Sequence, residues 1–94
     1  MNNRHNWTKQ DDYKVYCLYV LKINDTSKLE KVALDIGCKL GSLKMRIQNF
    51  EYLDTKTTGL ANYGKLSEEV YLELKNNFLK EEKIVNEFKN KFGF

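Results

Sequence analysis

The sequence predicts an all-α fold, with a helix-turn-helix core of three helices followed by a long C-terminal helix. The chain has no proline, only five glycines and many residues of high helix propensity. A β-sandwich or a small barrel needs more turn residues than this. With 94 residues, 41% of them hydrophobic and 13% aromatic, the chain is long enough for one domain with a packed core.

The first helix is predicted from about residue 9 to residue 22. Thr8 precedes an apolar run and is followed three residues later by Asp11, which is typical of a capping box at a helix start. Trp7 lies just before this cap, where it can pack on the first turn. Valine, tyrosine and cysteine are weak helix formers, so a strand over the same stretch is the main alternative.

The second helix follows the segment Ser-Lys-Leu-Glu, in which Ser27 and Glu30 have the spacing of a second capping box. Gly37 is placed to end this helix in a left-handed conformation. The apolar residues recur at helical spacing and define one inward face: Leu29, Val32, Ala33 and Ile36.

A third helix is predicted almost immediately afterwards, from about Leu40 to Tyr52. Its apolar residues fall at positions i, i+3, i+7 and i+10 and define a buried stripe: Leu40, Leu43, Ile47 and Phe50. The residues from Asp54 to Leu66 include Gly59 and Gly64 and show little periodicity, so an ordered loop is expected there.

The last helix is predicted to start after Ser67, its N-cap, and the sequence allows it to continue to Lys91. An apolar stripe runs along it at alternating +3 and +4 steps, with Glu81 as the only break: Tyr71, Leu74, Phe78, Val85, Phe88 and Phe92. Two arrangements would cover this stripe. The helix can pair with a second copy to make a homodimer, or it can bend near Lys80–Lys83 and fold back on its own domain.

These elements predict three segments along the chain. Residues 1–6 are expected to be a flexible N-terminus, because they are polar and precede the first cap. Residues 7–75 are expected to form the helix-turn-helix domain. Residues 76–94 are expected to form the C-terminal helical extension.

The composition excludes several chemistries. Two cysteines and one histidine, Cys17, Cys38 and His5, cannot supply a four-ligand Cys/His zinc site. His5 lies in the polar N-terminus, so no catalytic triad, no enzymatic activity and no metal or other cofactor is expected. Both cysteines lie in apolar segments and are expected to be buried free thiols. The apolar stretch from Val15 to Leu21 is too short for a membrane span or a secretory signal, so a cytoplasmic protein with no membrane partner is expected.

The spacing of Ala33, Gly37 and Leu43 is that of a helix-turn-helix unit. A small residue lets the helices approach, a glycine makes the turn, and an aliphatic residue closes the pair. The second helix of such a unit can enter a DNA major groove. Between Lys28 and Arg46 there are five basic and two acidic residues, so positive charge coincides with the unit, as contact with phosphates requires. A tight helical hairpin with a solvated charged face has the same pattern.

Six residues in the turn and the third helix lie away from its buried stripe and are the candidate DNA contacts: Lys39, Ser42, Lys44, Met45, Arg46 and Asn49. The lysines are expected at phosphates, and the arginine at a guanine edge or a phosphate. The serine can reach a phosphate or a base, and the methionine can lie against a thymine methyl group. The asparagine can contact a base or hydrogen-bond the following loop.

Several pieces of the sequence, taken in order, resemble a known family. They are Trp7-Thr8 with Asp11, then Leu18-Tyr19, Gly37, Gly41-Ser42-Leu43, Met45-Arg46-Ile47, Asn49-Phe50, Leu53-Asp54, Gly59-Leu60, Asn62 and Lys65-Leu66. In this order and spacing they resemble the N-terminal DNA-binding domain of bacterial HNH restriction-type endonucleases, a Myb/SANT-like helix-turn-helix unit. The resemblance covers about Trp7 to Leu74. It departs from the family at Gly64, where a serine is usual, and at Cys38-Lys39-Leu40, where Arg-Ser-Pro is usual.

The resemblance implies binding to double-stranded DNA and gives no support for cleavage, because an HNH site needs histidines and a metal-binding carboxylate and these are not expected here. A stand-alone copy is expected to be a small regulator or accessory factor of a phage or mobile element. The alternative is a protein-interaction module of the same fold that inhibits a host protein partner. DNA binding needs Lys39, Lys44 and Arg46 on one exposed face, whereas a protein binder needs an exposed apolar patch with tyrosines.

Overall fold

The computed structural model describes residues 5–55 and 64–94, which form five α-helices and no strand. The helices are α1 (Lys9–Val20), α2 (Thr26–Ile36), α3 (Leu40–Thr55), α4 (Lys65–Lys75) and α5 (Phe78–Phe92). The all-α prediction is confirmed. Within this part of the chain, no helix has both the length and the apolar character needed to cross a membrane.

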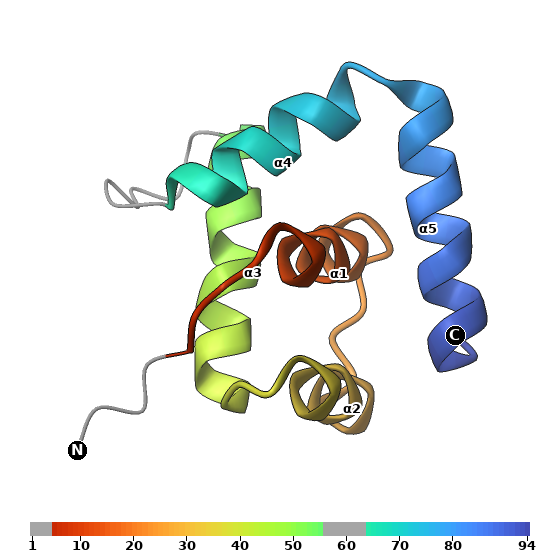
Figure 1. Cartoon of the computed structure of the whole chain (residues 1–94). Coiled ribbons are helices and arrows are strands. Elements are labelled where there is room, and N and C mark those ends of the chain that lie inside the picture. The colour runs from red at the N-terminus through yellow and green to blue at the C-terminus, as the bar shows by residue number, and fades with distance from the viewer. Residues whose placement is uncertain (1–4, 56–63) are drawn as a thin grey trace.

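Helix α1 occupies the centre of the molecule (Figure 1). In that view α3 lies to its left, α4 above it, α5 to its right and α2 below it, and α1 contacts all four. Four consecutive residues of α1 are buried as a result: Val15, Tyr16, Cys17 and Leu18. A helix surrounded in this way has no single apolar stripe, because nearly every side of it faces another helix.

Helix α1 begins at the predicted cap. Thr8 Oγ1 accepts the N–H of Asp11 at 3.1 Å, and Asp11 Oδ2 accepts the N–H of Thr8 at 3.1 Å, which completes the capping box. The helix ends two residues earlier than predicted, because Lys22 adopts a positive φ of 55° and the N–H of Ile23 donates to Leu18 O at 3.1 Å. The helical prediction, rather than the strand alternative, is confirmed.

Helix α2 is capped by Asp25, so the predicted capping box at Ser27 and Glu30 is wrong. Asp25 Oδ1 accepts the N–H of Ser27 at 2.9 Å and that of Lys28 at 3.3 Å. Its carboxylate also interacts favourably with the positive end of the helix dipole, and the helix therefore begins before Ser27. The predicted inward face is buried as expected: Leu29, Val32, Ala33 and Ile36.

Gly37 ends α2 in the left-handed conformation, with a φ of 91°. A Cβ here would meet nothing within 4 Å, so a substitution is opposed by the backbone conformation and not by a clash. Gly37→Val is expected to lower the free energy of unfolding by about 1–3 kcal/mol, measured as a drop in the thermal midpoint. Gly37→Asn is the control, because asparagine adopts this conformation more readily. Equal losses for the two variants would contradict the strain explanation.

Helix α3 begins at Leu40 as predicted and continues three residues beyond Tyr52. The predicted stripe faces the core. Leu43 and Phe50 are completely buried, and Leu40 and Ile47 are half-buried.

The predicted loop from Asp54 to Leu66 is shortened at both ends by α3 and α4. Its central part, residues 56–63, lies outside the described residues. Gly64 is the N-cap of α4 and makes no side-chain cap, so the predicted cap at Ser67 is wrong. Ser67 is instead completely buried in the first turn of α4, and its hydroxyl donates to Asp12 Oδ2 at 3.3 Å.

The last predicted helix does not continue to Lys91 as one helix, because it ends before Asn76 and a new helix starts after Asn77. Asn76 Nδ2 donates to Leu72 O at 2.8 Å. Asn77 Oδ1 accepts the N–H of Lys80 at 3.1 Å and caps α5. Asparagine side chains compete with the helical backbone for hydrogen bonds in this way, which explains why the break falls here.

Helix α5 turns back beside α1 (Figure 1). Phe88 and Phe92 are buried in the same core as α1, whereas Phe78 is 70% exposed. The structure thus shows the fold-back arrangement, with the bend slightly before the predicted Lys80–Lys83. Pairing with a second copy through this helix stays a prediction, and a large part of the stripe that it would use is covered within one chain.

Glu73 of α4 joins α1 and α5 through its carboxylate. The Tyr13 hydroxyl donates to Glu73 at 2.8 Å, Lys9 Nζ lies 3.2 Å away, and Lys80 forms an ion pair with the same group. The hydrogen bond from Lys80, followed by that from Tyr13, lowers the pKa of Glu73 from 4.5 to about 2. The stability that this carboxylate contributes is therefore fully present above pH 4.5 and is lost as the pH falls towards 2.

Glu73→Gln is expected to lower stability at neutral pH and to flatten the acid-induced loss between pH 4.5 and about pH 2. Denaturant unfolding at a series of pH values would measure both effects. Glu69→Gln, at an exposed position of the same helix, is the matched control and should keep the acid slope of the parent. An unchanged slope in Glu73→Gln would show that the carboxylate is not perturbed.

Candidate nucleic-acid interface

The end of α2, the Gly37 turn and the start of α3 form one compact unit. The N–H groups of Gly37 and Cys38 both donate to Ala33 O, at 2.8 and 3.0 Å, and α3 begins at Leu40. Ala33 and Leu43 are 4% and 0% exposed, and α2 contacts α3. The packing fixes the two helices relative to each other and leaves the side of α3 opposite Leu43 facing solvent.

Four of the six predicted contact residues are exposed, the first in the turn just before α3 and the others in its first turns: Lys39, Ser42, Lys44 and Met45. Met45 is 69% exposed. Within residues 5–55 and 64–94, neither Lys39 nor Lys44 forms an ion pair. Their ammonium groups are therefore available to an anion.

Gln48 extends the same side by one turn, although the sequence pattern did not single it out. It is exposed and lies three residues after Met45, as Met45 lies three residues after Ser42. This spacing is the signal that could have found it. Its amide can pair with an adenine edge in a major groove. We call the five residues the α3 surface: Lys39, Ser42, Lys44, Met45 and Gln48.

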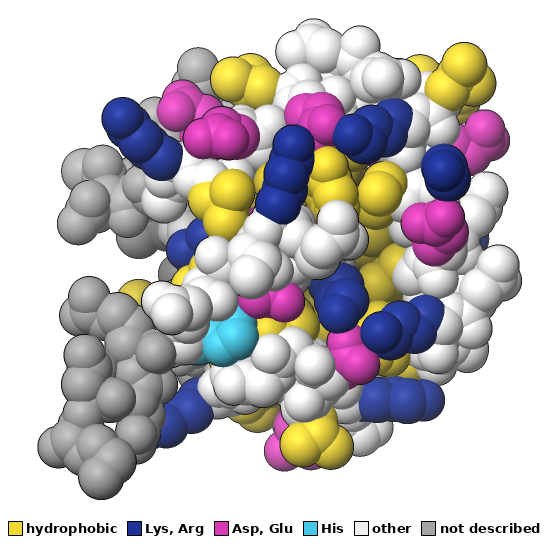
Figure 2. Space-filling view, viewed as in Figure 1, with side chains coloured by type: hydrophobic (Ala, Val, Ile, Leu, Met, Phe, Trp, Pro, Cys, Tyr) yellow, Lys and Arg dark blue, Asp and Glu magenta, His cyan; other side chains and the backbone are white. Residues whose placement is uncertain are grey.

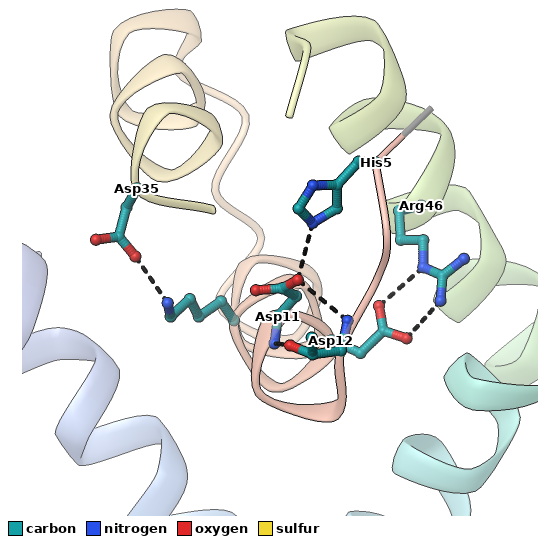
Figure 3. A network of polar contacts seen from close by, with 7 residues as sticks. His5, Asp11, Asp12, Asp35 and Arg46 are labelled. Carbon is teal, nitrogen blue, oxygen red and sulfur yellow. Dashed lines mark hydrogen bonds and ion pairs between the residues drawn. The ribbon is translucent and has the colours of Figure 1, made fainter. Parts of the chain in front are cut away.

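Arg46 points into the domain and not onto the α3 surface (Figure 3). Its Nε and one terminal nitrogen donate to the two carboxylate oxygens of Asp12, at 2.9 and 2.7 Å. The side chain of Asp12 is 0% exposed and that of Arg46 is 15% exposed. The guanidinium also lies over the Trp7 ring, 4.7 Å from its centroid. Arg46 therefore joins α3 to α1, and contact with DNA would require this buried pair to break.

Trp7 also contacts His5, which lies with it in the segment before α1. His5 lies edge-on to Trp7, with ring centroids 4.8 Å apart. Its Nε2 is 2.8 Å from Asp11 Oδ2, as Figure 3 shows. These contacts of His5 were not predicted from its place in a polar N-terminus. They attach the start of the described chain to α1, and through Trp7 to Arg46 of α3.

Two further cations of the basic segment lie against the C-terminal end of the chain. The Nζ atoms of Lys28 and Lys31 are 5.3 and 5.8 Å from the centroid of the Phe94 ring. Lys31 Nζ also donates to Phe92 O at 3.1 Å. Together with Arg46, three of the five basic residues of this segment contact other parts of the protein.

The remaining predicted contact and the two cysteines are less accessible. Asn49 is half-buried, so we leave it out of the α3 surface. Cys17 is buried, Cys38 is half-buried, and both are free thiols. Burial raises the pKa of both thiols, that of Cys17 to about 12, so both are protonated at neutral pH.

Comparisons of the chain with protein-family models, with curated proteins and with solved structures find no match. The function is therefore argued from the surface itself.

Proposed function

We propose that this protein binds double-stranded DNA through the α3 surface, as a small helix-turn-helix regulator or accessory factor. One observation carries the proposal: the α2–α3 unit presents an uncovered side of α3 flanked by Lys39 and Lys44, which form no ion pair with any described residue. The spacing of Ala33, Gly37 and Leu43 supports it. So does the resemblance to the Myb/SANT-like domain of HNH restriction-type endonucleases.

The chemistry of the α3 surface suits a duplex. Lys39 directly precedes the amino end of α3, where the helix dipole also favours a phosphate. Lys44 supplies a second cation about one turn further along. Ser42, Met45 and Gln48 offer a hydroxyl, a thioether and an amide, groups that contact phosphates, thymine methyl groups and adenine edges respectively. Arg46 supports this surface by holding α3 against α1.

Lys39→Gln combined with Lys44→Gln is expected to weaken binding to duplex DNA. The parent should bind in the micromolar range or more weakly, because one unit with two such cations neutralises few phosphates. In a plot of log K against log salt, the slope should fall by about 0.9 for each phosphate that the variant no longer neutralises. Fluorescence anisotropy with a labelled random duplex, titrated at several salt concentrations, would measure both quantities.

The matched control is Lys65→Gln combined with Lys83→Gln. It removes the same charge from exposed positions on α4 and α5 and should leave the salt slope close to that of the parent. Equal weakening by the two double variants would place the binding elsewhere. A parent that shows no salt-dependent binding to duplex DNA would contradict the proposal as a whole.

A protein-interaction module is the second candidate, favoured by exposed apolar side chains near the junction of α4 and α5. Leu72, Phe78 and Leu79 are 51%, 70% and 75% exposed. Tyrosines do not reinforce this surface in the way expected, since Tyr13 and Tyr16 are buried and donate to glutamates of α4 and α5. If the parent fails to bind duplex DNA even at low salt, these side chains become the leading interaction surface.

A further inference from the structure

A hollow of about 250 Å³ lies between α1 and α5, on the face of the molecule shown in Figure 2. Its floor is apolar and includes the buried side chains of Cys17, Phe88 and Phe92. Packed interiors leave few voids larger than a water molecule, and an apolar cavity of about 150 Å³ can hold a benzene ring. The α1–α5 groove, as we call this hollow, therefore has room for a small apolar body.

Two cations stand at the groove. Lys14 of α1 and Lys91 of α5 both line it, and their Nζ atoms lie 2.7 and 3.4 Å from the two carboxylate oxygens of Asp35 in α2. An ammonium group has three donors. Lys14 donates a hydrogen bond to Asp35, and Lys91 forms an ion pair with the same carboxylate and lies 5.8 Å from the centroid of the Phe92 ring. Among the described residues, the two ammonium groups share this one carboxylate and pair with no other.

The position between these lysines already stabilises a carboxylate. The hydrogen bond from Lys14 is the main cause that lowers the pKa of Asp35, and Lys91 adds to it. Glu87 also lines the groove and contributes a negative charge. A ligand with one negative charge therefore fits better than one with two, and Gln10 adds a neutral polar group to the lining.

We propose that the α1–α5 groove binds a small amphipathic monocarboxylate. Its apolar body lies on the floor formed by Cys17, Phe88 and Phe92, and its carboxylate lies at Lys14 and Lys91. Sites of this kind combine an apolar lining with a few polar groups that fix the orientation of the ligand. The inference does not depend on DNA binding, because the groove and the α3 surface share no residue.

Octanoate is the probe, and octanol, which has the same chain length and no charge, is its matched partner. Titration of each into the full chain, followed by two-dimensional amide NMR spectra, should shift resonances of groove residues in α1 and α5. Octanoate should bind about tenfold more tightly than octanol, because charge-assisted hydrogen bonds are stronger than neutral ones. Equal affinity for the two probes, shifts confined to other helices, or no saturable octanoate binding would each overturn the proposal.

Lys14→Gln combined with Lys91→Gln should weaken octanoate binding about tenfold and leave octanol binding unchanged. Lys65→Gln combined with Lys83→Gln removes the same charge outside the groove and should change neither. Ile84→Phe adds volume at the lining and should weaken both probes. If that variant does not fold, the lysine variants and the amide resonances that shift in the parent still test the proposal. Unchanged octanoate affinity in the folded Lys14 and Lys91 variant would reject the site.

Discussion

Arg46→Ala is expected to lower the free energy of unfolding by about 3–5 kcal/mol, the usual loss when one partner of a buried ion pair is removed. The loss arises at Asp12, whose carboxylate is 0% exposed and would remain in the interior without its cation. Its remaining partner in the buried cluster is the Ser67 hydroxyl, at 3.3 Å. Trp7 would lose the guanidinium above its ring. Since the free energy of unfolding of small domains is about 5–15 kcal/mol, this loss is a large share of the total stability.

Denaturant unfolding followed by circular dichroism would measure this loss. Lys44→Ala is the control, because it truncates an exposed cation of the same helix and should change stability by no more than about 0.5 kcal/mol. Arg46→Met combined with Asp12→Leu should recover much of the loss, because apolar side chains often replace a buried ion pair without penalty. An Arg46→Ala variant that unfolds like the parent would mean that the pair does not hold α3 to α1.

Phe88→Ala combined with Phe92→Ala is expected to leave the protein largely unfolded at physiological temperature. The two rings are 4% and 5% exposed, and their centroids lie 4.9 Å apart. The Phe94 ring packs on both, at 5.8 and 5.6 Å. Truncation of one buried phenylalanine to alanine costs about 3–5 kcal/mol, so the two losses together approach the whole stability of a small domain.

The matched control is Phe78→Ala in the same helix, where the side chain is 70% exposed and little change is expected. A cooperative melt of the double variant close to that of the parent would contradict the packing of α5 on the core. The parent also distinguishes folding back from dimerisation. Its thermal midpoint should not depend on protein concentration if the apolar stripe is covered within one chain, whereas pairing between copies would raise the midpoint with concentration.

Features of the fold that depend on neighbouring residues could be predicted from the sequence. The Thr8–Asp11 capping box, the Gly37 turn and the inward face of α2 each involve residues within about two turns, and the structure confirms them. The error at Ser67 involves a residue whose partner is distant. Ser67 has the residue type of an N-cap and acids after it, yet its hydroxyl hydrogen-bonds Asp12, which lies 55 residues away.

The sequence contained a local signal for the break between α4 and α5, but the helical spacing of the apolar residues favoured one continuous helix. The apolar stripe continues at helical spacing on both sides of Asn76 and Asn77, because both helices face the same core. Two adjacent asparagines are poor helix formers and good caps, and this pair was the evidence for a bend.

The same difference between near and distant partners applies to the candidate site. Helical periodicity places Lys44 and Met45 of α3 on the exposed side, where the structure has them. Arg46 lies at the flank of the buried stripe, and its long side chain can turn either way from there. Its direction is set by Asp12, 34 residues earlier in the chain, and no pattern within α3 contains that information.

The central position of α1 has a consequence for the order in which the protein folds. Helix α1 is the first helix of the chain, yet Tyr13 and Tyr16 donate to Glu73 and Glu81, which lie 60 and 65 residues later. Closing loops of this length costs chain entropy before any contact stabilises them, and such long-range contacts slow folding relative to simple helical bundles. During synthesis on the ribosome, α1 emerges long before the helices that bury it. The domain therefore reaches its final packing only after α5 has left the ribosome.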